Sequence, residues 1–174
     1  LGTAIEDVMK RVVDEEQHQI TLSHAFYIGE TEVTVGFWQM MMSENPTALG
    51  GGSCFRSDYP LVVSEDFPVF CVDFFSSLEM ANLLSEWEGF EPCYDLSGYR
   101  PKWVNHDCDG YRLPTEAEWE SAAIGHSFDL EIEKKVSLYA GGDNLEDFGW
   151  SSINSGRHPN PVAHKKSNAI GLYD

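Results

Sequence analysis

Turn-forming residues interrupt this chain so often that they limit which folds it can adopt. Clusters of Gly, Pro, Asn and Asp recur along its 174 residues, and each ends hydrophobic periodicity before a long element can develop. Helical spacing of apolar residues is confined to residues 34–42, 76–89 and 115–125. Residues 20–28 and 67–72 suit short strands. The sequence therefore predicts an α+β domain with a few short helices, short strands and many loops.

The first two predicted helices each show one apolar face. Thr34 is the predicted N-cap of the first helix, and Ser76 with Glu79 forms a predicted capping box for the second. The apolar face of the first consists of Phe37, Met40 and Met41. The apolar face of the second consists of Met80, Leu83, Leu84 and Trp87. We interpret both faces, including the methionines, as core filling.

The third predicted helix has the clearest start in the chain. Thr115 and Glu118 form a predicted capping box, and Glu116 adds negative charge at the positive end of the helix dipole. Trp119 begins the predicted inward face, which Ala122 and Ala123 continue. Gly125 is the predicted end of this helix, as Gly89 is of the second. These residues are expected to have structural roles.

Arg112 stands just before this helix and has two interpretations. Its guanidinium could bind an anion through two parallel hydrogen bonds. Alternatively, it could form an internal ion pair that fixes the helix to the core, since Glu116, Glu118 and Glu120 follow closely. The excess of neighbouring acids favours the structural interpretation.

The charge of the chain excludes several classes of partner. With 11 Lys and Arg against 29 Asp and Glu, the formal net charge is −18. Nucleic-acid binding needs a basic surface, and anionic lipid repels an acidic one. No apolar run approaches the ~20 residues of a membrane span, so direct membrane insertion is not expected. The acidity indicates either a solvated surface or attraction for cations such as calcium.

The four cysteines show no metal-binding spacing. Cys54, Cys71, Cys93 and Cys108 form no C-x-x-C motif, and their separations differ from those of zinc fingers and ribbons. Cys93 and Cys108 flank a loop rich in turn residues, which makes them the first candidates for a disulfide in an oxidising compartment. Four buried free thiols are the alternative.

Familiar catalytic motifs are missing from the sequence. It contains neither H-E-x-x-H nor G-x-S-x-G, and nothing singles out one pair among its many carboxylates as acid and base. Oxygen ligands for calcium could come from Asp143, Asn144, Asp147 and Asn154. Their spacing is not that of an EF-hand loop.

Several longer motifs resemble one family in the order that the family shows. Residues 110–123, GYRLPTEAEWESAA, resemble the signature of the formylglycine-generating enzyme family, also called the sulfatase-modifying-factor domain. Residues 26–34, 68–74 and 168–174 resemble its F-x-I-G-x-x-E-V-T, P-V-x-x-V-x-W and N-x-x-G-L-Y-D segments. The resemblance covers residues 20–174 as one domain and leaves residues 1–19 as a lead-in segment.

The resemblance implies an irregular, C-type-lectin-like α+β fold. It also implies a copper-dependent activity in some members, whose two copper-binding cysteines follow the G-L-Y-D segment. None of the four cysteines here corresponds to them, so we expect a domain truncated at its C-terminal end and leave open whether the protein is an enzyme. Copper would be a cofactor only if a later cysteine pair exists. Some members bind calcium near the residue equivalent to Asn154, which makes Asn154 the candidate metal ligand.

Three functions follow as hypotheses. The first is a non-catalytic binding or structural module on an extracytoplasmic surface (periplasmic, cell-surface or secreted), with a protein or peptide partner. The second is part of a copper-dependent oxidase that converts a sulfatase cysteine to formylglycine, with its catalytic cysteines in a missing C-terminal segment. The third, a calcium-dependent sugar binder, lacks the E-P-N and Q-P-D tripeptides of sugar-binding lectins.

Overall fold

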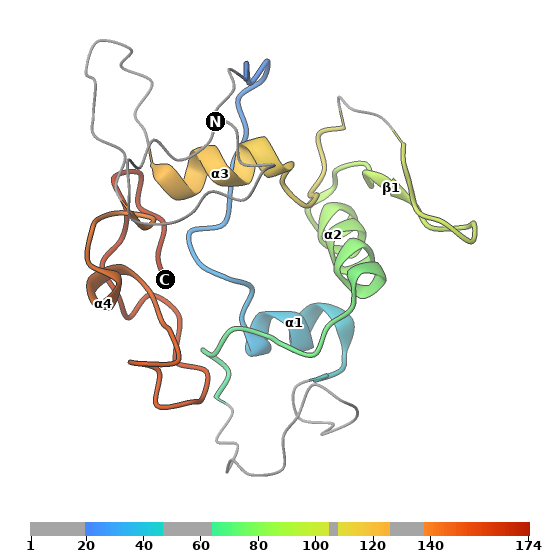
Figure 1. Ribbon diagram of the computed structural model, residues 1–174. Helices are drawn as coiled ribbons and strands as arrows, with labels where there is room; N and C mark the ends of the chain where they lie inside the picture. The colour runs from blue at the N-terminus through green and yellow to red at the C-terminus, as the bar shows by residue number, and fades with distance from the viewer. Residues whose placement is uncertain (1–19, 47–63, 105–107, 126–137) are drawn as a thin grey trace. The chain divides into compact units, whose positions relative to one another are not determined.

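The computed structural model describes residues 20–46, 64–104, 108–125 and 138–174. Its elements are α1 (Val35–Met42), α2 (Phe74–Glu88), β1 (Tyr94–Asp95), β2 (Lys102–Trp103), α3 (Glu116–Ile124) and α4 (Leu145–Phe148), shown in Figure 1. The chain divides into two compact units. One comprises Val33–Leu113, and the other comprises Leu1–Glu32 together with Pro114–Asp174. Short helices, a small sheet and many loops agree with the α+β prediction.

Helix α1 begins where the sequence predicts but buries a different face. The Thr34 hydroxyl accepts a hydrogen bond from the Phe37 amide at 3.2 Å, as expected of an N-cap. Val35 and Trp38 are the buried residues, each 2% exposed, whereas Met40 is 58% exposed. The predicted core face was therefore wrong. The reason is tertiary: Val35 and Val33 hydrogen-bond to Phe67 and Val69, which fixes the orientation of the helix start.

Helix α2 starts three residues earlier than predicted. Asp73 is its N-cap, and its carboxylate accepts from the Ser76 amide at 2.8 Å. This hydrogen bond lowers the pKa of Asp73. Gly89, in the left-handed conformation, ends the helix as expected. The predicted Ser76–Glu79 capping box was wrong, because Asp73, an N-cap as favourable as serine, precedes it.

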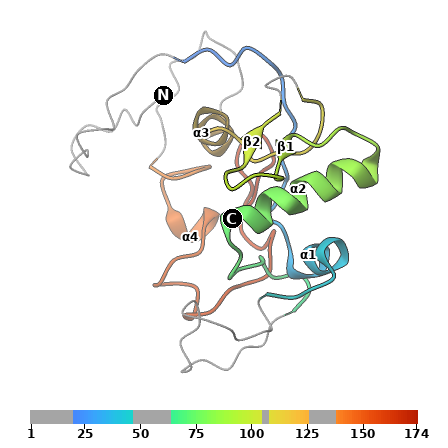
Figure 2. The ribbon, with the colours of Figure 1, turned by 90° about the vertical axis from the view of Figure 1, so that its right-hand side faces the viewer.

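A second, polar face of α2 organises the unit that contains it. Asn82 donates to the Tyr94 carbonyl at 2.7 Å and accepts from the Tyr94 amide at 3.1 Å, so it pairs with β1 as a strand would. The buried Ser85 hydroxyl donates to Ala81 and accepts from the Tyr111 amide, both at 2.8 Å. Leu78, Asn82 and Ser85 share this face at i, i+4 and i+7. Helix α2 lies next to the β1–β2 pair in Figure 2.

The strands are shorter than predicted and lie elsewhere. Residues 20–28 form no strand, and within 67–72 there is only an isolated bridge between Thr34 and Pro68. The sheet is instead the antiparallel pair β1–β2, in which Tyr94 faces Trp103 and Asp95 faces Lys102. Each strand has two residues, too few for an alternating pattern to reveal it.

Helix α3 confirms its predicted start. The Thr115 hydroxyl accepts from the Glu118 amide, and the Glu118 carboxylate accepts from the Thr115 amide at 2.8 Å, which completes the capping box. Ala122 is buried as predicted, but Trp119 is 61% exposed, so its assignment to the inward face was wrong. The buried residues of this nine-residue helix are Glu118 and Ala122. Glu118 forms the capping box, and the Ala122 carbonyl accepts a hydrogen bond from Asn168, so contacts rather than side-chain size decide which positions are covered.

A buried asparagine connects α3 to the 168–172 loop. The Asn168 amide group donates to the Ala122 and Ala123 carbonyls at 2.8 and 3.2 Å. Its side-chain oxygen accepts from the Ile170 and Leu172 amides at 3.1 and 3.0 Å. Asn168 thereby satisfies helix-end carbonyls that the helix itself leaves unpaired.

Candidate functional site

The described cysteines form disulfides. Cys93 and Cys108 are bonded to each other with their Cα atoms 5.5 Å apart, the pairing that the sequence favoured. Cys71 is also disulfide-bonded, and Cys54 lies outside the described residues. The alternative of four free thiols is therefore wrong. Because a copper(I) thiolate site needs free thiolates, Cys71, Cys93 and Cys108 do not fit such a site in this form.

Arg112 lies against the β1–β2 pair. Its guanidinium carbon is 5.4 Å from the centre of the Trp103 ring, and its Nη1 donates to the Leu113 carbonyl at 3.2 Å. A guanidinium stacked on an indole gains cation–π attraction. Tyr94, which faces Trp103 in the β1–β2 pair, accepts a hydrogen bond from the Leu113 amide through its hydroxyl oxygen at 2.9 Å. These contacts hold the segment that precedes α3.

Asn154, the candidate calcium ligand, makes several hydrogen bonds within its own loop. Its side-chain oxygen accepts from the Ser151 amide at 2.7 Å, and its Nδ2 donates to the Gly149 carbonyl at 2.9 Å. Among the residues that the structure describes, no group of three or more His, Cys, Asp and Glu side chains could hold a metal ion. Calcium at Asn154 stays a prediction, and a titration followed by the melting temperature would check it.

A second set of loop contacts is made by Lys165, near α4. Lys165 lies 4.0 Å from the centre of the Trp150 ring, and its Nζ donates to the Glu146 carbonyl at 2.7 Å. Its backbone amide donates to the Asp174 carboxylate at 2.9 Å. Both the ammonium group and the backbone amide of Lys165 hold loop segments together, so we assign it a structural role.

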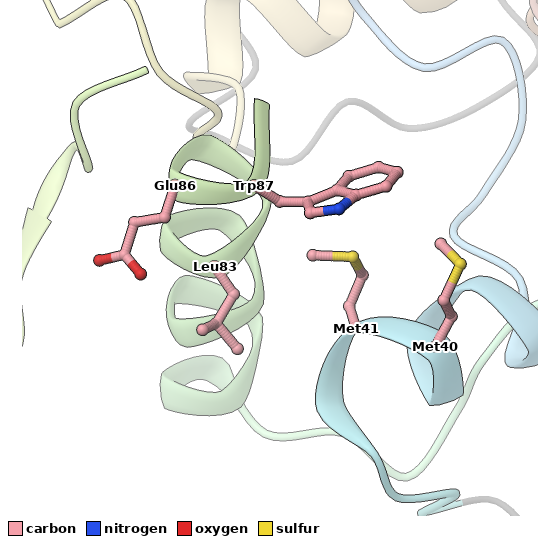
Figure 3. A pocket seen from close by; sticks show the side chains of 5 residues that line it. All are labelled: Met40, Met41, Leu83, Glu86 and Trp87. Carbon is pink, nitrogen blue, oxygen red and sulfur yellow. The ribbon is translucent and has the colours of Figure 1, made fainter. Parts of the chain in front are cut away.

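An apolar groove lies between α1 and α2, which are neighbours in both ribbon views (Figures 1 and 2). Its volume is about 430 Å³. The residues that line it are Met40, Met41, Leu83, Glu86 and Trp87. In Figure 3 the Trp87 indole extends from α2 towards the two methionine side chains of α1. Trp87 is 64% exposed, so its assignment to the core was wrong.

The groove was missed because apolar spacing alone does not say which part of a face is covered. Met80 of the same predicted face is buried, while Trp87, about two turns further along, lies in the last turn of the helix before the Gly89 cap. A large aromatic residue in the last turn, next to a helix stop, was the available signal. An apolar residue at that position can extend beyond its packing partner.

Comparison with known proteins identifies the family. The model of the sulfatase-modifying factor enzyme 1-like domain matches residues 3–174. The chain belongs to this family. It is 30% identical over 186 aligned positions to a protein named chaperone protein LppX from Paenibacillus barcinonensis, covering 89% of this chain and 60% of that protein. The chain thus spans less than two thirds of that relative.

Two solved structures share the fold. Treponema denticola variable protein 1 matches with a TM-score of 0.63 at 29% identity, over 82% of this chain and 55% of its own. CarF matches with a TM-score of 0.62 at 28% identity, over 83% of this chain and 62% of its own. The sulfatase-modifying-factor fold and the α+β class predicted from sequence are therefore confirmed.

Proposed function

We propose that this member of the sulfatase-modifying-factor family is a non-catalytic module that binds another polypeptide outside the cytosol. The observation that carries the proposal is the use of the cysteines: Cys93 is bonded to Cys108, and Cys71 is disulfide-bonded as well. Structural disulfides persist in oxidising compartments. The same bonds remove these thiols from any copper-binding role.

The comparison with known proteins also supports the proposal. The relative named as a chaperone is a protein whose name describes action on other polypeptides. No helix within the described residues has both the length and the apolarity to cross a membrane. A polypeptide partner also suits a domain whose described surface carries exposed aromatic residues such as Trp87 and Tyr99.

The experiment tests binding and catalysis on the same preparation. Cells that make the full protein are treated with a short amine- or carboxyl-reactive cross-linker, and adducts are identified by mass spectrometry. The purified protein is then incubated with copper(I), oxygen and a sulfatase-derived cysteine peptide. We expect adducts with another extracytoplasmic polypeptide and no formylglycine.

Formation of formylglycine would overturn the non-catalytic assignment and favour the oxidase, with a cysteine pair elsewhere in the protein. Thiol labelling without reductant provides the compartment test. Four labelled cysteines in the native protein would contradict an oxidising location, since the structure requires Cys71, Cys93 and Cys108 to be unreactive.

A further inference from the structure

The α1–α2 groove combines a rigid aromatic wall with adaptable walls. Trp87 and Met40 are 64% and 58% exposed, and a well-packed core would cover side chains of this size. An indole offers a large contact area at little conformational cost, and thioethers adjust to the shape of what they contact. Side chains of these types are those that anchor a partner at the centre of an interface.

The helices that form the groove belong to acidic stretches of the sequence. Residues 33–46 and 64–98, which include α1, α2 and β1, contain nine Asp and Glu and no Lys, Arg or His. One of the nine, Glu86, lines the groove itself. Carboxylates beside an apolar surface attract a cationic partner and orient it.

The charge also argues against other occupants. A second copy of the chain would bring its own net charge of −18 against this acidic surface. An anionic lipid surface would be repelled for the same reason. A neutral apolar molecule would make no use of the Glu86 carboxylate.

We propose that the α1–α2 groove binds a short basic peptide segment through one large apolar side chain. The apolar side chain inserts beside Trp87 and Met41, and a neighbouring Lys or Arg of the peptide pairs with Glu86. This inference rests on the proposed polypeptide-binding function and names the chemistry of its partner.

The test uses the full chain and a fluorescent peptide of about nine residues, made of Lys and Gly with one central Phe. Binding is followed by fluorescence anisotropy at low and physiological salt. Two comparison peptides replace the central Phe by Ala or every Lys by Glu. We expect each replacement to weaken binding about tenfold or more, since anchors and charge pairs dominate such interfaces.

Matched variants locate the site. Trp87→Ala is compared with Trp119→Ala, because the two indoles are 64% and 61% exposed and lie in different units. Glu86→Lys is compared with Glu30→Lys, which makes the same change of charge in the other unit. We expect about tenfold loss of affinity for each groove variant and less than about twofold for each control. Circular dichroism confirms that every variant is folded.

Several outcomes would overturn the inference. Equal binding of the Phe and Ala peptides would show attraction by charge alone, and equal loss in Trp87→Ala and Trp119→Ala would place the site elsewhere. Sedimentation showing a dimer that Trp87→Ala dissociates would make a second copy the occupant. If cross-linking finds a polypeptide partner but none of the peptides binds, this inference fails while the proposed function stands.

Discussion

Single residues decide whether two parts of the backbone in this fold can approach each other closely. Gly110 is an example, because a Cβ built on it would lie 2.2 Å from the Glu91 carbonyl oxygen and 2.7 Å from the Ser85 hydroxyl. The backbone passes so closely here that only glycine fits without movement. The buried serine and the amide of Tyr111, which bond at 2.8 Å, depend on this approach.

Gly110→Ala is therefore expected to destabilise the protein by about 1–3 kcal/mol through overpacking. Urea unfolding followed by tryptophan fluorescence measures the change. Gly98→Ala is the control, because its nearest atom, the Arg100 carbonyl oxygen, is 3.7 Å from the added Cβ. Equal destabilisation by the two substitutions would contradict the steric argument.

Glu32 predicts a pH dependence. Partial burial, and then the charge of Asp174, raise the pKa of Glu32 above its ordinary value of 4.5, against a backbone hydrogen bond that lowers it. The folded protein therefore holds this proton more tightly than the unfolded chain. Its contribution to stability is fully present below pH 4.5 and is lost as the pH rises through the raised folded pKa.

We expect Glu32→Gln to have a small effect on the melting temperature near about pH 4 and to raise it near about pH 7. Glu30→Gln, an exposed neighbour, serves as the control in the same buffers. A melting temperature for Glu32→Gln that falls relative to the native protein as the pH rises would show that the sign is wrong.

At the scale of elements, short helices depend on their ends. Helix α3 has nine residues, a length at which an isolated helix is marginal in water. Its capping box, the Asn168 contacts at the last carbonyls and the left-handed Gly125 supply what the helix interior lacks. The chemistry of a cap is local, which is why the sequence alone predicted the start and the end of this helix correctly.

Thr115→Ala is expected to reduce stability by about 1 kcal/mol, because the Glu118 amide loses its acceptor. Thr115→Ser keeps the hydroxyl and is expected to retain most of that stability. Thermal unfolding by circular dichroism compares the three proteins. If Ser and Ala are equally destabilising, the lost interaction is the packing of the threonine methyl group instead.

At the scale of the whole molecule, disulfides and family membership limit what the protein can do. The Cys93–Cys108 bond closes a loop with a sequence separation of 15 around the β1–β2 pair. The family match over residues 3–174 gives the fold, and the chain covers 55–62% of the three related proteins.

The double substitution Cys93→Ser with Cys108→Ser is expected to cost about 3 kcal/mol, the value for a loop of about 15 residues in the chain-entropy account. Denaturant unfolding with and without reductant measures it. Reductant should destabilise the native protein at least as much as the double substitution does, because it also breaks the disulfide of Cys71. Stability unchanged by the double substitution would show that the loop is held by its hydrogen bonds alone.

Local chemistry was readable from the sequence, and long-range geometry was not. The sequence by itself determined the α+β class, the Thr34 and Thr115 caps and the Gly89 and Gly125 stops, because each depends on a few neighbouring residues. It also favoured the Cys93–Cys108 pair. The two-residue strands are too short to show an alternating apolar pattern, so the sequence indicated a strand at residues 20–28 instead.

Only the tertiary structure decided which helix faces are covered. Val35 is buried at the start of α1, where the backbone bonds to residues 67–69, and Ser85 is buried because Gly110 allows the chain to approach it. Met40, Trp87 and Trp119 have large apolar side chains of the kind found in cores, but all three are exposed. Burial of an apolar side chain is favourable in free energy, but it requires a second surface that packs against that side chain. The path of the backbone determines whether such a surface is present.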